Sequence, residues 1–211
     1  MPCNDLVFLH VDAALLVIVK PSGLPAVPGR AVGLADCAST RVQSRYADAR
    51  VVHRLDMATS GLMLLARGAD AQRTLNRQFA QRTVAKTYIA LVAGQLAPQG
   101  EIALPLAADW PARPKQKVDP VHGKPSLTHW RVLDHDPARD VSRLELTPVT
   151  GRSHQLRVHL QALGHPILGD TLYAPPEVQA LAPRLMLHAS RLGVLHPVSM
   201  LPLRFESAAP F

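Results

Sequence analysis

Charged residues interrupt an apolar stretch between positions 51 and 66, VVHRLDMATSGLMLLA. Apolar residues flank His53, Arg54 and Asp56 on both sides, so the pattern predicts a buried strand. Such a strand has no packing reason to carry a cation and a carboxylate two residues apart. A carboxylate can act as a nucleophile or base, and a guanidinium can bind phosphate, so this stretch is the first candidate for chemistry.

Two further segments contain polar side chains among apolar residues. AKTYIALV contains Lys86 and Tyr88, and TGRSHQLRVHL contains Arg152 and Arg157. Each residue has an ordinary structural interpretation: Asp56 as a turn carboxylate before Thr59-Ser60-Gly61, Tyr88 as a strand aromatic, Arg152 as a surface cation. Together, one carboxylate, several arginines and one tyrosine indicate a site for an anionic polymer.

Several common chemistries lack their motifs. The sequence has no G-x-x-x-x-G-K-[ST], no G-x-G-x-x-G after a strand and no G-x-S-x-G. His154 and His159 are five positions apart, which is not the spacing of H-E-x-x-H, and no cysteine pair supports a zinc site. His188 and His196 are interpreted as structural or surface residues. Metal and redox chemistry are therefore not expected.

The composition is that of a basic globular protein. The 211 residues carry a formal charge of +7, and arginine (18) far outnumbers lysine (5). Guanidinium groups pair with phosphates and stack on bases, which favours a nucleic-acid partner, although a solvated basic surface would give the same count. The two cysteines, Cys3 and Cys37, cannot form a disulfide framework, and the apolar run at 13–19 is too short to cross a membrane. A cytoplasmic protein is expected.

The predicted elements are strands with scattered helices. Strands are expected at 15–19, 86–92, 126–133 and 143–149, and a helix at 69–81. A second helix is expected after Gly151, with Leu156, Leu160 and Leu163 on one face and Gly164 just past its end. Residues 98–125 are proline-rich and predicted to be irregular. Without βαβ regularity, this order indicates an α+β fold with a mixed, largely antiparallel central sheet flanked by helices and loops.

At the same residues the sequence resembles the RluA family of RNA pseudouridine synthases. The matching stretches are VKPSGL (19–24), HRLDMATSGL (53–62), KTYIALV (86–92), GRSHQLRVHL (151–160) and LGHPILGDTLY (163–173). They occur in the family's order over most of the chain. The resemblance implies a single catalytic domain over 1–211, without the S4 RNA-binding domain of several relatives.

Within the family, PSGLPAVPGR, DWPARPKQKV, GKPSLTHW and PRLMLHA are similar to a dual-specificity member. That member acts on large-subunit (23S) ribosomal RNA and on the transfer-RNA anticodon stem-loop. The resemblance implies an isomerase that flips a uridine out of its stack, breaks its N1–C1′ bond and rejoins the base through C5. No cofactor is implied, and RNA stem-loops are the expected partners of a monomeric enzyme.

The resemblance also implies roles for individual residues. Asp56 is the expected catalytic carboxylate, Arg152 its cationic partner, and Tyr88 the residue against the flipped uracil. Arg54 is expected to enter the RNA stack in place of the flipped base. The other expected RNA contacts are His53, Arg113, Lys115, Lys117, Leu156 and Arg157, where Leu156 suits core packing equally well.

Three other interpretations remain open. The chain could modify only one of the two RNAs. It could be a basic RNA-binding protein without catalysis, in which case Asp56 would be dispensable. A nucleoside hydrolase is a third class, but such enzymes usually need two carboxylates at the reacting bond, and the motifs offer one, Asp56.

Overall fold

The computed structural model describes residues 6–29 and 35–211, and Cys3 lies outside them. The chain divides into two compact units. Unit 1 is formed by Met1–Lys86 and His188–Pro210, and unit 2 by Thr87–Leu187 and Phe211. The chain passes from unit 1 to unit 2 within β5 (Ala85–Ala93) and returns within β11 (Leu187–Leu195). The single domain expected from the sequence stays a prediction.

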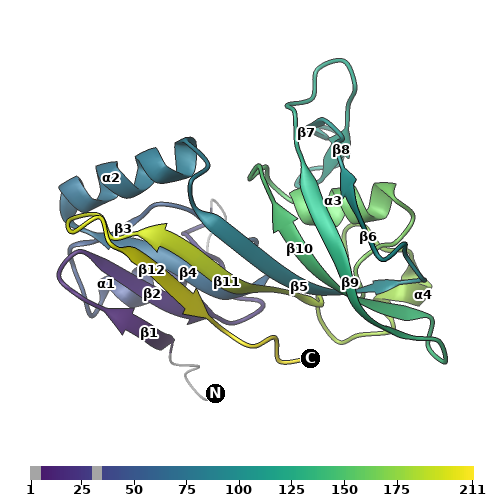
Figure 1. The fold of residues 1–211 in the computed structure, drawn as a ribbon, viewed down its shortest axis with the longest axis horizontal. Helices are drawn as coiled ribbons and strands as arrows, with labels where there is room; N and C mark the ends of the chain where they lie inside the picture. Colours follow the sequence, from purple (N-terminus) through teal and green to yellow (C-terminus); the bar gives the residue numbers. More distant parts are fainter. Residues whose placement is uncertain (1–5, 30–34) are drawn as a thin grey trace. The chain divides into compact units, whose positions relative to one another are not determined.

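Unit 1 is built on a mixed sheet (Figure 1). β2 pairs antiparallel with β1 and β4, and β3 pairs antiparallel with β4. β4 pairs parallel with β11, which pairs antiparallel with β12. The elements are β1 (Val7–Val11), β2 (Leu15–Lys20), α1 (Ala38–Gln43), β3 (Ala49–Val51), β4 (Ser60–Arg67), α2 (Gly68–Ala80) and β12 (Pro202–Glu206), together with most of β11.

The core of unit 1 lies between this sheet and α2. Ala71 and Leu75 of α2 pack on buried residues of β2, β4 and β11, among them Leu64 and Leu192. Figure 1 shows α2 lying across these strands. β4 is buried at every position from Ser60 to Ala66. It therefore lacks the alternation of buried and exposed side chains seen in a strand with one solvent-exposed face. The predicted helix at 69–81 is confirmed to within one residue.

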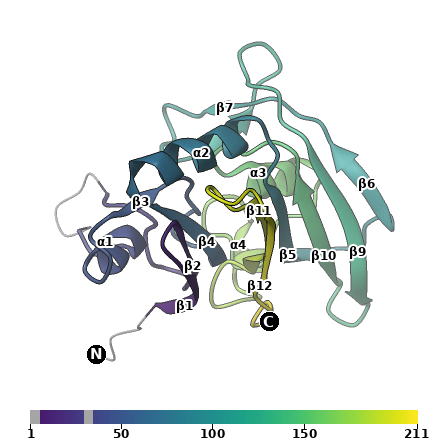
Figure 2. The ribbon, with the colours of Figure 1, turned by 60° about the vertical axis from the view of Figure 1, so that its left-hand side comes forward.

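Unit 2 contains an antiparallel sheet in the order β5-β10-β9-β6, whose strands lie side by side in Figure 2. A separate two-stranded sheet pairs β7 with β8. The elements after β5 are β6 (Gln99–Ile102), β7 (Leu106–Ala108), β8 (Gln116–Val118), β9 (Thr128–Asp136), β10 (Val141–Pro148), α3 (Gln155–Ala162) and α4 (Pro176–Gln179). The predicted α+β class with a largely antiparallel sheet is confirmed.

α3 packs through the apolar face that the sequence predicts, with one correction. Leu156 and Leu160 are buried, but Leu163 follows the last helical turn and is 38% exposed. The helix ends there because Gly164 adopts a φ of +89°, the left-handed conformation that glycine takes most readily. Leu163 is therefore a capping residue and does not extend the apolar face.

Two further sequence predictions are corrected by the structure. Residues 51–66 are not one strand: β3 ends at Val51 and β4 begins at Ser60, so the charged residues between them lie in a connection. The segment 98–125 is not wholly irregular, because it contains β6, β7 and β8. These strands have only three or four residues each, too few to produce a clear alternation.

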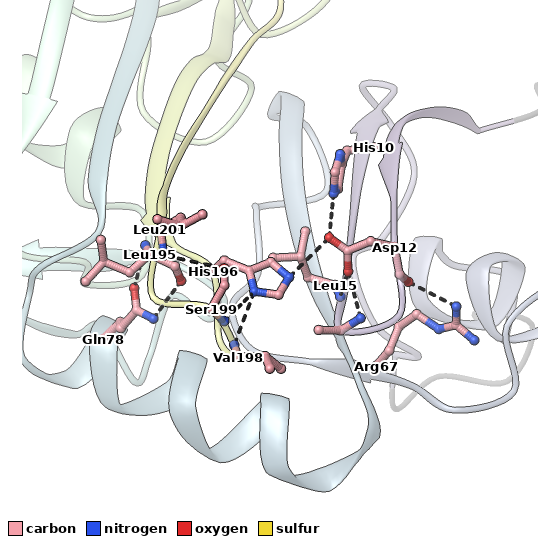
Figure 3. Close-up of polar contacts among 11 residues, drawn as sticks. His10, Asp12, Leu15, Arg67, Gln78, Leu195, His196, Val198, Ser199 and Leu201 are labelled. Carbon is pink, nitrogen blue, oxygen red and sulfur yellow. Dashed lines mark hydrogen bonds and ion pairs between the residues drawn. The ribbon is translucent and has the colours of Figure 1, made fainter.

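One carboxylate joins two turns of unit 1 (Figure 3). Asp12 lies between β1 and β2, where its carboxylate accepts hydrogen bonds from His10 Nε2 at 2.7 Å and from the Ala14 and Leu15 N–H groups. Its Oδ2 also lies 3.3 Å from Nε2 of His196, which follows β11. Burial opposes ionisation of Asp12, but the bonds from His10 and the backbone lower its carboxyl pKa to about 2. The carboxylate is therefore ionised at neutral pH and holds the two turns together.

Candidate active site

Asp56 lies in the connection from β3 to β4, where a turn precedes the strand. Thr59 N–H donates to the Asp56 carbonyl at 3.1 Å, and the side chain of Asp56 is half-buried. Just beyond the turn, Gly61 pairs with Ala189 of β11 at a φ of +113°. A Cβ at Gly61 would lie 2.3 Å from the Ala189 carbonyl oxygen, so only glycine allows this approach. The pairing fixes the end of the Asp56 connection.

Lys20, at the end of β2, is fully buried beside the same connection. Its Nζ donates to the carbonyls of Pro21 (2.8 Å), Leu24 (2.8 Å) and Met57 (3.0 Å). Burial lowers the Lys20 pKa to about 8, and the negative charge of Asp56 opposes that shift. Lys20 therefore ties the 21–24 turn to the residue after Asp56 and places positive charge near the carboxylate.

We expect Lys20 to give catalysis at Asp56 an alkaline limb in its pH–rate profile. As pH rises through about 8, the ammonium of Lys20 loses a proton, so one of its carbonyl bonds and its attraction for Asp56 are lost. Turnover should fall on that side, and Lys20→Met should be slower at neutral pH and lack the limb. Initial rates from pH 6 to 10 test this, and an unchanged limb in Lys20→Met would assign it to another group.

His53 has partners within unit 1, and its predicted contact with RNA stays a prediction. Its Nε2 accepts from Leu64 N–H of β4 at 2.9 Å, and its ring stacks on Phe79 of α2 at 4.7 Å between centroids. Burial, aided by Lys86, lowers the His53 pKa to about 4. The ring is therefore neutral at physiological pH and anchors the start of the connection. Arg54, the next residue, is exposed, as a contact with RNA requires.

Unit 2 carries the other two predicted catalytic residues. Tyr88 lies in β5 opposite Leu146 of β10 and is half-buried. Arg152 lies just before α3, where its backbone N–H donates to Gln155 Oε1 and its guanidinium donates to the Pro125 carbonyl at 3.3–3.4 Å. The predicted pairing of Arg152 with Asp56 involves both units and stays a prediction.

Arg157 has a structural role in unit 2, and its predicted contact with RNA stays a prediction. It is 3% exposed, and its guanidinium donates to both carboxylate oxygens of Asp170 at 2.7 and 2.8 Å. Asp170 is equally buried and also accepts from Leu172 and Tyr173 N–H. This bidentate pair holds α3 to the 170–173 turn. Leu156, on the same helix, is buried, which fits the core-packing alternative.

The three cations between residues 113 and 117 lie on the β7–β8 hairpin, in which β7 and β8 are antiparallel neighbours. Arg113 and Lys117 are exposed, and Lys115 is half-buried. Lys117 Nζ lies 3.8 Å from the half-buried carboxylate of Asp119, and the Lys117 side chain is 52% exposed. The hairpin thus presents these cations close together in the sequence and on one element, as a contact with RNA backbone requires.

Sequence reasoning missed Lys20, Asp170 and Tyr173 as residues that organise the site. The Tyr173 hydroxyl accepts from Gln116 N–H at 2.8 Å and lies 2.6 Å from His154 Nδ1, so it joins the β7–β8 hairpin to the turn after Arg152. A lysine ending an apolar strand was the available signal for Lys20. Within residues 6–29 and 35–211, no group of three or more His, Cys, Asp or Glu side chains could hold a metal ion.

Lys20 is the cation that the structure relates to the Asp56 carboxylate within unit 1, and comparison with known proteins defines the class of the protein. Residues 14–162 match the family model described as RNA pseudouridylate synthase. The chain belongs to this family and is an RNA pseudouridine synthase, an enzyme that isomerises uridine in RNA.

Individual relatives agree. The chain is 50% identical to the "Dual-specificity RNA pseudouridine synthase RluA" of Escherichia coli K12, covering 98% of this chain and 94% of the relative. It is also 50% identical to the protein of that name from Pasteurella multocida, over 100% and 95% of the two chains. Among solved structures, human RNA Pseudouridylate Synthase Domain Containing 1 superposes with a TM-score of 0.81 at 31% identity, covering 99% of this chain and 85% of that one. The resemblance found in the motifs is confirmed.

No helix among the described residues is long and apolar enough to cross a membrane.

Proposed function

We propose that this enzyme has dual specificity and converts uridine to pseudouridine in stem-loops of 23S ribosomal RNA and in the transfer-RNA anticodon stem-loop. The supporting observation is its similarity, over nearly the whole chain, to enzymes named as dual-specificity pseudouridine synthases. We further propose that it works in the cytoplasm as a monomer, and that the two units act as one catalytic domain.

In the proposed mechanism, Asp56 is the ionised carboxylate that initiates cleavage of the N1–C1′ bond. The base then turns, C5 bonds to C1′, the proton on C5 leaves and N1 gains a proton, so no electrons or water are consumed. Arg54 enters the RNA stack where the target base had been, and Tyr88 stacks on the flipped uracil. The role of Asp56 is supported by the buried ammonium of Lys20, which interacts electrostatically with this carboxylate.

The proposal is tested with isolated RNA fragments. A transfer-RNA anticodon stem-loop and a ribosomal stem-loop, each with 5-tritiated uridine, are incubated with the enzyme, and release of tritium reports formation of the C5–C1′ bond. Both fragments should be modified. Modification of only one would restrict the specificity to that RNA, and failure of both would show that dual specificity for isolated stem-loops is wrong.

We expect Arg152→Met to lower turnover by about 10²–10³-fold, the scale seen when one group that stabilises charge in a transition state is removed. Methionine keeps much of the side-chain length but cannot neutralise the carboxylate. The measurement is single-turnover release of tritium at saturating enzyme. Arg139→Met, at an exposed arginine of the β9–β10 turn, is the matched control and should react like the unsubstituted enzyme. Equal rates in both variants would show that Arg152 has no catalytic role.

A further inference from the structure

The tip of the β7–β8 hairpin exposes an aromatic ring that no sequence motif assigned to the site. Trp110 is 67% exposed, whereas every other Trp, Tyr and Phe in the part of the chain that the structure describes is buried or half-buried. Aromatic residues make up only 4% of the sequence. A scattered exposed apolar residue needs no explanation, so the surroundings of Trp110 decide whether it has a role.

Arg113 lies against the face of the Trp110 ring. The guanidinium carbon of Arg113 is 3.3 Å from the ring centroid, a stacking distance. Hydrogen bonds within the turn hold both residues: Asp109 N–H donates to the Lys115 carbonyl, Lys115 N–H to the Ala112 carbonyl, and Ala112 N–H to the Asp109 carbonyl. Where this turn meets β8, the Tyr173 hydroxyl accepts from Gln116 N–H and fixes the hairpin. The Trp110–Arg113 stack is thus held on a closed turn.

A basic groove borders the same hairpin. It has a volume of about 820 Å³, and its lining includes Asp109, Lys115 and Lys117 on the hairpin and Gln161 and Tyr173 across from them. Two lysines beside an exposed indole combine the two features by which proteins hold single-stranded nucleic acid: cations that follow the backbone and an aromatic ring on which a base stacks.

We propose that Trp110, backed by Arg113, is a stacking platform for an unpaired base of the substrate RNA other than the target uridine, while the adjoining backbone follows the groove past Lys115 and Lys117. This inference rests on the proposed function for its ligand. Unpaired loop bases stack on aromatic rings and guanidinium planes in RNA complexes. A guanidinium that lies flat on a ring also keeps its N–H groups at the rim, where phosphates can accept from them.

The first test uses the fluorescence of Trp110. The protein has two tryptophans, and Trp130→Phe leaves Trp110 as the only one. Trp130 packs against Gly100, and phenylalanine retains a ring there. Adding an anticodon stem-loop to the Asp56→Asn/Trp130→Phe protein should quench the emission as a base stacks on the indole. Replacing one loop nucleotide by an abasic residue should abolish the quenching. Binding without quenching, or quenching that no abasic position removes, would overturn the platform.

The second test separates stacking from charge. Trp110→Ala should weaken binding by about 5- to 150-fold, as expected from alanine substitution of a base-stacking residue, without changing the salt dependence. Trp110→Phe should retain most of the affinity. Lys115→Ala should instead reduce the slope of log K against log salt by about 0.7–0.9. Val121→Ala, at an exposed apolar residue in the loop after β8, is the control and should bind like the unsubstituted protein.

The outcomes distinguish this inference from the proposed function. If the unsubstituted enzyme releases tritium from the stem-loops while Trp110→Ala binds them within about twofold of wild type, the platform is wrong and Arg113 only covers the indole. If the unsubstituted enzyme binds neither stem-loop, the proposed function is wrong, and the proposed ligand of the Trp110 platform is wrong as well.

Discussion

Asp56→Asn should abolish isomerisation and leave RNA binding intact. The amide has nearly the shape of the carboxylate but lacks its charge, so it can act neither as a nucleophile nor as a base. We expect turnover to fall by about 10⁴-fold or more, the scale seen when an essential nucleophile or its base is removed from other enzymes. The change lies in a connection that Lys20 holds at Met57 and that the pairing of Gly61 with Ala189 holds at its end, so the fold should persist.

Tritium release from 5-tritiated uridine measures this loss, and a filter-binding titration with the same stem-loop measures affinity. Asp70→Asn is the matched control, because Asp70 is an exposed carboxylate on α2 of the same unit. It should show wild-type turnover. An Asp56→Asn protein that still turns over near the wild-type rate would remove Asp56 from the mechanism and favour the non-catalytic RNA-binding alternative.

Arg157→Met should destabilise unit 2 by about 3–5 kcal/mol, because it leaves the Asp170 carboxylate buried without its cation. Both tryptophans, Trp110 and Trp130, belong to this unit, so their fluorescence during urea unfolding reports its stability. Arg157→Met/Asp170→Asn should regain part of the loss. The asparagine still offers an oxygen to the Leu172 and Tyr173 N–H groups but carries no unpaired charge.

The control for this prediction is a pair of the same chemistry at the surface. Arg131 on β9 donates to Glu145 on β10 at 2.9 Å, but Arg131 is 59% exposed, so Arg131→Met should cost only about 0–1 kcal/mol. An equal loss of unfolding free energy in Arg131→Met and Arg157→Met would show that burial of the Arg157–Asp170 pair does not increase its contribution to stability. An Arg157→Met protein as stable as wild type would contradict the structural role of this arginine.

The elements predicted from the sequence are those with a clear period. The apolar spacing of α2, the strand composition of β5 and the alternation of β10 led to bounds close to those observed. β7 and β8 escaped detection because each has three residues. The 51–66 stretch was read as one strand because apolar residues on both sides of a connection look like the two ends of a strand.

The residues of the site were predicted by type rather than by environment. The sequence singled out Asp56 and Arg152 as polar residues among apolar ones, and the resemblance implied their roles. It could not distinguish an arginine that contacts RNA from one that pairs with a buried carboxylate. Arg157 was assigned to RNA because Asp170, its partner, lies thirteen positions away and only the fold brings them together. The partners of His53, a backbone N–H of β4 and a ring of α2, are likewise brought to it only by the fold.

The chain returns to unit 1 after it has formed unit 2, and this order determines which unit can be complete first during synthesis. Apart from Phe211, unit 2 is one continuous segment, whereas unit 1 needs residues 188–210 to supply β11 and β12. Leu192 and Val194 of β11 fill its core, and Ala189 closes on Gly61. During translation, Asp56 is synthesised early and Ala189 late. The sheet of unit 1 therefore lacks β11 and β12 during most of the synthesis of the chain. We therefore expect a chain truncated before β11 to be inactive, because it cannot complete the sheet that ends the Asp56 connection.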